Sequence, residues 1–67
     1  MKNSLHIERA IKKMTQAELA DQVSVSRQTI NSIESNKYTP STLLALKIAR
    51  VFGKPVEQIF QLEKKDL

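Results

Sequence analysis

The 67-residue chain has no cysteine and no tryptophan, and it contains only one glycine, two prolines, two phenylalanines and one tyrosine. Without cysteine it can form neither a disulfide nor a zinc site that needs thiolates. The scarcity of glycine and proline excludes a glycine-rich phosphate-binding loop and leaves too few turn residues for a multi-stranded fold. The few aromatic residues cannot form a platform that stacks single-stranded bases. These absences favour a helical domain.

No apolar run approaches the roughly 18 residues of a membrane span, and the chain does not open with a signal-peptide pattern. We therefore expect a cytoplasmic protein with no membrane partner. A single domain over residues 1–67 suits this length. The one histidine, His6, has no companion ligand, and no nucleophile motif is present. We expect no enzymatic activity, metal, cofactor or small-molecule ligand.

The charge balance favours a polyanionic partner. Eleven basic residues stand against seven acidic ones, which gives a net charge of +4 and a pI near 9.7. Such an excess on a small surface attracts nucleic acid. It is equally compatible with a soluble basic protein, so the charge alone does not decide. Because aromatic residues are scarce, duplex DNA fits better than a single strand.

Sequence patterns predict three helices in the first half of the chain. The first covers about residues 4–13. Its apolar face is expected to hold Leu5, Ile7, Ala10, Ile11 and Met14. Thr15 and Glu18 form a capping box at the start of the second helix, and Ser26 is a good N-cap for a third helix over about 27–35. The expected inward positions around this pair of helices are Leu19, Ala20, Val23, Val25, Ile30 and Ile33.

Two further helices are predicted in the second half. Thr39–Pro40 indicates the start of the fourth, with threonine as N-cap and proline at the first helical position. Gly53 indicates its end after Phe52. Pro55 begins a short fifth helix through about Phe60, and the remaining tail is either frayed or a strand. The fold class is therefore all-α with five helices.

The segment over about residues 16–35 predicts a helix-turn-helix, because two short helices with suitably spaced apolar residues flank a tight turn. The outward face of its second helix carries Arg27, Gln28, Asn31 and Ser35. Glutamine and asparagine can pair with adenine in the major groove, and arginine with guanine. A single polar residue of this kind is usually only a solvated surface residue. The spacing of the apolar core residues, the helix N-cap and the polar outward face together indicate a DNA-reading motif.

These segments resemble the Cro/CI-type repressors of the xenobiotic-response-element group. The resemblance is carried by Thr-Gln-Ala-Glu-Leu-Ala at 15–20, Val-Ser-Arg-Gln-Thr-Ile-Asn at 25–31, Ile-Glu at 33–34, Asn-Lys-Tyr at 36–38, Pro40 and Leu-Lys-Ile-Ala at 46–49. It covers about residues 3–60 and is strongest to short stand-alone members. It implies a compact lambda-repressor-like fold.

The resemblance also implies which residues touch DNA. Base contacts are expected from Arg27, Gln28, Thr29, Asn31 and Ser32. Backbone contacts are expected from Gln16, Ser26, Asn36, Lys37 and Tyr38. Glu34 matches a structural position and is left out of the contact set.

Two positions depart from the family pattern. Ser24 stands where the turn usually has glycine. If its backbone is left-handed, serine costs about 1 kcal/mol relative to glycine. Glu8 stands where an apolar residue is common, and we expect Ile7 and Ile11 to compensate for it.

The second half carries more apolar surface than a monomer of this size easily hides. A single helix-turn-helix spans one half-site, and affinity normally requires two protomers about 34 Å apart. We therefore expect a dimerisation segment over 55–67, with Val56, Ile59, Phe60 and Leu62 at the interface and a short strand at Gln61–Glu63.

These observations predict a sequence-specific, double-stranded DNA-binding transcriptional regulator, a homodimeric repressor that occludes a promoter at a pseudo-palindromic operator. Two alternatives stay open. The chain could be an antitoxin whose main partner is a toxin, or an adaptor that uses the same motif for protein contacts only.

Overall fold

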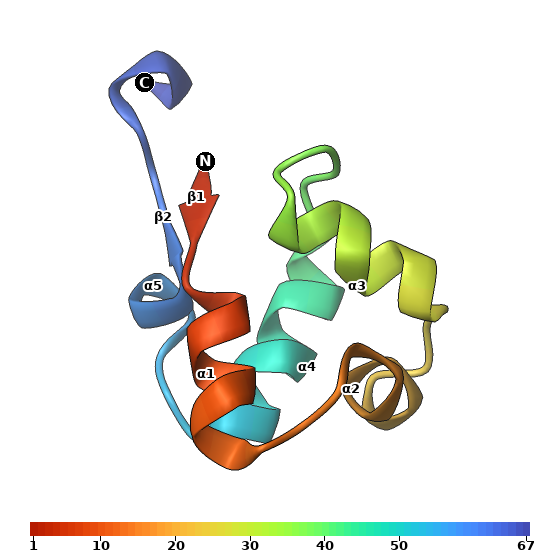
Figure 1. Cartoon of the computed structure of the whole chain (residues 1–67). Helices are drawn as coiled ribbons and strands as arrows, with labels where there is room; N and C mark the ends of the chain where they lie inside the picture. The colour runs from red at the N-terminus through yellow and green to blue at the C-terminus, as the bar shows by residue number, and fades with distance from the viewer.

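Five helices account for most of the chain, and the computed structural model describes all 67 residues. The elements are β1 (Lys2–Asn3), α1 (Leu5–Lys12), α2 (Gln16–Gln22), α3 (Arg27–Glu34), α4 (Thr42–Phe52), α5 (Val56–Ile59), β2 (Phe60–Gln61) and the 3₁₀ turn η1 (Lys64–Asp66). The helices surround one core, and the two termini lie on the same side of the molecule, away from α2 and from the N-terminal end of α3 (Figure 1). The predicted five-helix fold is confirmed.

Side-chain caps set the starts of α2 and α3 where the sequence predicts them. The Thr15 hydroxyl accepts a hydrogen bond from the Glu18 N–H at 3.0 Å, and the Glu18 carboxylate accepts one from the Thr15 N–H at 2.9 Å. The Ser26 hydroxyl likewise accepts from the Thr29 N–H at 3.1 Å. Both caps satisfy backbone donors that a helix start otherwise leaves unpaired.

The predicted start of the fourth helix is wrong by two residues. The helix begins at Thr42, and its N-cap is Ser41, whose hydroxyl accepts from the Leu44 N–H at 3.2 Å. Pro40 lies before this cap and is buried. Serine can therefore cap the helix while the proline ring packs inward. The predicted end is confirmed, because Gly53 adopts a left-handed conformation with φ +64°.

The chain end also differs from the prediction. Pro55 lies just outside α5, and Phe60 leaves the helix to begin β2. This strand pairs antiparallel with β1, with Lys2 opposite Gln61 and Asn3 opposite Phe60. The strand expected at Gln61–Glu63 thus starts one residue earlier and pairs within the chain. The sequence does not predict the N-terminal strand, because two residues show no periodicity.

Twelve buried apolar residues form a single core. They are Leu5, Leu19, Ala20, Val23, Ile30, Ile33, Leu44, Ile48, Ala49, Phe52, Ile59 and Phe60. All the inward positions predicted for α2 and α3 belong to it, apart from Val25, which packs half-buried at its edge. The core therefore holds the two helices of the predicted motif against α4 and α5.

The predicted apolar face of α1 is wrong in part, because Leu5 is buried and Met14 packs against the core but the isoleucines do not. Ile7 and Ile11 are 51% and 68% exposed, whereas Glu8 is only 8% exposed. The Glu8 carboxylate accepts a hydrogen bond from Lys54 Nζ at 2.9 Å. Because Lys54 in the α4–α5 turn supplies a counter-charge, the inward side of α1 tolerates the acid, and Ile7 and Ile11 do not replace it in the core.

Ser24 has a left-handed backbone with φ +61°, as its family position implies. The turn demands this conformation, because the Val25 N–H donates back to the Ala20 carbonyl at 3.0 Å across the end of α2. Glycine adopts such angles without penalty, and serine does not.

We expect Ser24→Gly to raise the free energy of unfolding by up to about 1 kcal/mol, because it removes the left-handed backbone penalty. Gly53→Ala should lower it by a similar amount. A Cβ at Gly53 would meet nothing within 4 Å, so the loss would come from the backbone alone. Urea unfolding followed by circular dichroism measures both. A destabilised Ser24→Gly protein would show that the turn is not strained.

Candidate nucleic-acid interface

In the helix pair α2–α3, one face of α3 is buried against the core and the opposite face is exposed to solvent. Ile30 and Ile33 are 0% and 1% exposed and fix α3 on the core. Arg27, Gln28 and Asn31 are exposed on the other side. The core residues thereby determine which polar side chains of α3 can reach a ligand.

The five residues expected at base edges differ in their solvent exposure. Arg27, Gln28 and Asn31 form the exposed face, whereas Thr29 and Ser32 are half-buried along one flank. The Thr29 hydroxyl lies 2.9 Å from the Ser26 hydroxyl, at the cap of the same helix. The structure thus brings three of the five together on the exposed face of α3 and places the other two beside them.

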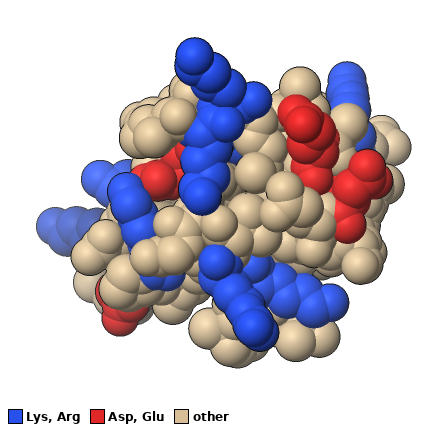
Figure 2. Space-filling view, turned by 90° about the horizontal axis from the view of Figure 1, so that it is seen from below, with Lys and Arg blue, Asp and Glu red and all other residues tan.

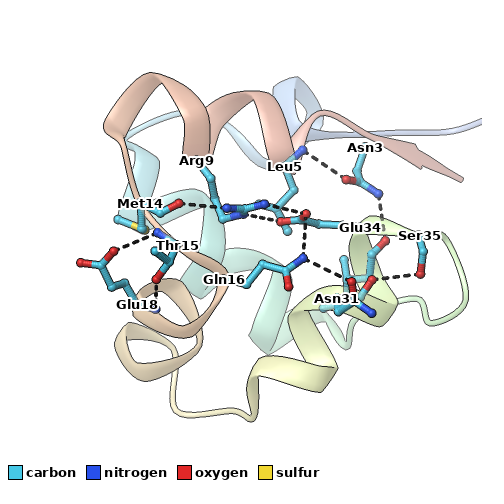
Figure 3. A network of polar contacts seen from close by, with 11 residues as sticks. Asn3, Leu5, Arg9, Met14, Thr15, Gln16, Glu18, Asn31, Glu34 and Ser35 are labelled. Atoms are coloured by element: carbon cyan, nitrogen blue, oxygen red, sulfur yellow. Dashed lines mark hydrogen bonds and ion pairs between the residues drawn. The ribbon is translucent and has the colours of Figure 1, made fainter.

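An ion pair between Arg9 and Glu34 joins α1 to the end of α3 (Figure 3). Arg9 Nε lies 2.5 Å from Glu34 Oε2, and Arg9 Nη2 donates to Glu34 Oε1 at 2.9 Å. Arg9 Nη1 also donates to the Met14 carbonyl at 2.9 Å. The two side chains are 17% and 10% exposed. Glu34 therefore has the structural role that the sequence implies, whereas sequence reasoning misses its partner Arg9 because the pair is distant along the chain.

Gln16 connects this ion pair to the exposed face of α3. Its Nε2 group donates to Glu34 Oε1 at 3.1 Å and to Asn31 Oδ1 at 3.3 Å. Since an ionised carboxylate only accepts, Glu34 determines which side of the Gln16 amide faces it. Both Nε2 hydrogens are then in use, so the phosphate contact expected of Gln16 requires the longer bond to Asn31 to open.

The pKa of Glu34 lies below its ordinary value. Burial acts to raise it, but the hydrogen bonds from Arg9 and Gln16 and the positive charge of Arg9 together outweigh the burial. The carboxylate is thus stabilised in its charged form, which is the form that holds Arg9 and orients Gln16.

The loop after α3 is held by backbone bonds and by a residue from β1. The N–H groups of Lys37 and Tyr38 donate to the Ser32 carbonyl at 2.9 and 3.2 Å. Asn3 Nδ2 donates to Asn36 Oδ1 at 3.1 Å and to the Ile33 carbonyl at 3.0 Å. The Lys37 and Tyr38 side chains remain exposed. Asn3 is a positioning residue that sequence reasoning misses, because nothing local marks it.

The basic residues do not gather into one patch on the face that Figure 2 shows, where acidic side chains stand among them. On this face, charge alone therefore does not single out an interface, and the exposed residues of α3 are the candidate that the sequence predicts. None of the helices has the length and apolar character that crossing a bilayer requires.

A double-mutant cycle on Arg9→Met and Glu34→Gln should give a coupling free energy of about 1–2 kcal/mol at pH 7. This value lies between those of exposed and fully buried pairs, because the Arg9–Glu34 pair is partly exposed. The stabilisation is fully present above the ordinary glutamate pKa of 4.5 and is lost as the pH falls through the lowered pKa of the folded state. Urea unfolding at pH 7 and pH 3 tests this, and an unchanged coupling at pH 3 would contradict it.

Comparisons with known proteins agree with this geometry. The helix-turn-helix family model HTH_3 matches residues 5–59. The chain is 52% identical over 63 residues to an HTH-type transcriptional regulator of Methanocaldococcus jannaschii, and the match covers 94% of this chain and 96% of the relative. It is 42% identical over 66 residues to the HTH-type transcriptional regulator YgzD of Bacillus subtilis, covering 98% and 100%.

The family model and both relatives match nearly the whole chain, and the match includes the helix pair α2–α3 with its exposed face. A regulator of this kind acts by binding double-stranded DNA and is not typically an enzyme. The chain belongs to the Cro/CI-type helix-turn-helix family of DNA-binding transcriptional regulators.

Proposed function

We propose that this regulator is a homodimeric repressor that binds a pseudo-palindromic operator and occludes a promoter. The observation that carries the proposal is the exposed face of α3, on which Arg27, Gln28 and Asn31 stand over a fully buried opposite face. Such a helix fits the major groove with these side chains at base edges. Repression by occlusion requires occupancy of the DNA and no chemical step.

In the proposed complex, Gln28 pairs with adenine and Arg27 with guanine, and the Thr29 methyl and Ser32 border these contacts. Asn31 adds a further contact one turn along α3. Each good paired contact contributes about 1–3 kcal/mol of discrimination against the wrong base.

The proposed backbone contacts lie at the two ends of α3. Ser26 lies at its N-terminus. Lys37 and Tyr38 extend from the loop beyond its C-terminus, where Asn36 holds the loop through Asn3. Gln16 reaches a phosphate by exchanging its bond to Asn31. These contacts set the register of α3 and carry no sequence information themselves.

The proposed dimer uses an apolar groove of about 290 Å³ where α4, α5 and β2 meet the N-terminus. Of the expected interface residues, Val56, Phe60 and Leu62 line this groove, and Leu62 is 68% exposed. Ile59 is 0% and Phe60 is 7% exposed, so both contribute chiefly to the core of the protomer. Leu46, which is 54% exposed in the same groove, joins the proposed interface although the sequence does not mark it.

A second protomer is the occupant that the proposed function favours for this groove, because one α3 reads only one half-site. The antitoxin alternative has no support among the relatives, whose names describe transcriptional regulators.

Selection from a randomised duplex pool should enrich a site with two symmetric halves about 34 Å apart, centre to centre. On that duplex, Gln28→Ala should lose discrimination at one base pair in each half.

Lys37→Ala should weaken binding to selected and scrambled duplexes alike. It should also lower the slope of log affinity against log salt by about 0.9 per protomer. Fluorescence anisotropy at several salt concentrations measures both, with Gln22→Ala, exposed on α2, as the control. A pool without an enriched motif would contradict the proposal.

Leu62→Asp should shift the protein from dimer to monomer at micromolar concentration, because it places a charge in the proposed apolar interface. Sedimentation equilibrium without DNA measures the shift. Ile11→Asp is the matched control, since Ile11 is also 68% exposed but lies on α1, outside the groove. A wild-type protein that sediments as a monomer, or an equal effect of both variants, would overturn the assignment of this surface.

A further inference from the structure

A second, polar groove of about 610 Å³ runs beside α3, between the α2–α3 turn and the first half of α4. Gln28, Thr29 and Ser32 line it from α3. The groove is therefore continuous with the proposed base-reading face. It lies on the flank of α3 that faces α4, whereas Gln16 from α2 and Arg9 from α1 contact α3 residues on another side.

The chemistry of this groove suits a phosphodiester strand. No aspartate or glutamate lines it. Its hydroxyl groups come from Ser24, Ser26, Thr29, Ser32, Tyr38 and Ser41. Ser41 accepts a backbone bond with its oxygen at the cap of α4, which leaves its own O–H group able to donate. Ser26 and Thr29 share one hydroxyl–hydroxyl bond, which leaves one of their two O–H groups able to donate. Hydroxyl groups are common donors to phosphate oxygens in protein–DNA complexes.

The groove contains one cationic side chain, Lys47, on the second turn of α4. Lys47 is exposed and forms no ion pair within the chain. The apolar side chains of Leu43 and Leu44 lie in the same groove. A lysine beside apolar side chains and hydroxyls matches a strand whose phosphates are charged and whose sugars present C–H groups.

The position of the groove agrees with the geometry of the duplex. A helix in the major groove, which is about 12 Å wide, has one sugar–phosphate strand on each side. The strand on the α2 side meets Gln16. The strand on the other side must pass along the flank of α3 that faces α4, where this groove lies.

We propose that this groove holds the second sugar–phosphate strand and that Lys47, outside the helix-turn-helix motif, contacts one of its phosphates. The inference rests on the proposed operator binding and adds a contact residue to it. It assigns to α4 a direct role in DNA affinity beside its role in the core.

Lys47→Met tests the proposed phosphate contact, because it removes the charge and keeps an unbranched apolar stem. We expect the slope of log affinity against log salt to fall by about 0.9 per protomer and the affinity at 0.1 M salt to fall about eightfold for each lysine replaced. Selected and scrambled duplexes should be affected alike, since a phosphate contact carries no sequence information. Lys64→Met is the matched control, because it removes the same charge from exposed η1 near the termini (Figure 1).

A second measurement locates the contact on the DNA. Ethylation of one phosphate per half-site, on the strand facing α4, should weaken binding of the wild-type protein and leave Lys47→Met unaffected. Thermal unfolding should be the same for both variants, because Lys47 has no ion pair to lose.

Equal salt slopes for Lys47→Met and Lys64→Met, on a duplex that the wild-type protein selects, would overturn the inference and leave the operator binding intact. A wild-type protein that selects no duplex would instead overturn the proposed function.

Discussion

The ion pair between Arg9 and Glu34 is the interaction on which the placement of the exposed face of α3 depends. It joins the first helix to the end of α3, and through Gln16 it also reaches the start of α2. Apolar packing alone would allow these short helices to slide by small amounts, because the hydrophobic effect is non-directional. Two charged hydrogen bonds with fixed geometry supply the direction that packing lacks. The exposed amide of Asn31 is thus held by a charge that is itself almost buried.

Local chemistry explains why so much of the helix-turn-helix was predictable. Thr15 and Glu18 interact within one turn, and Ser26 caps the helix that directly follows it. Ile30 and Ile33 reveal the inward side of α3 by their spacing alone. These signals require no knowledge of the rest of the molecule. The family resemblance extends them to the residues expected to touch DNA, whose roles stay predictions.

Features that depend on distant partners could not be predicted in this way. Glu8 is buried only because Lys54 reaches it across 46 positions. Asn3 and Arg9 meet α3 and its loop from far along the chain. The two short strands have no pattern of their own and exist because α5 brings Phe60 beside Asn3. Helix amphipathicity misplaces Ile7 and Ile11 of α1, since Glu8, paired with the exposed Lys54, occupies an inward position where an apolar residue is expected.

The antiparallel pairing of β1 with β2 gives the fold a property that the helices alone do not have. Asn3 belongs to this pairing, and the same side chain is bonded to Asn36 and to the Ile33 carbonyl at the end of α3. The chain ends and the loop of Lys37 are therefore linked through one side chain, so that their openings are coupled. Fraying of the N-terminal strand would remove the two Asn3 bonds and leave the loop held by its backbone bonds to the Ser32 carbonyl. Amide hydrogens in the tail and in that loop should consequently show coupled exchange, although they are far apart in sequence.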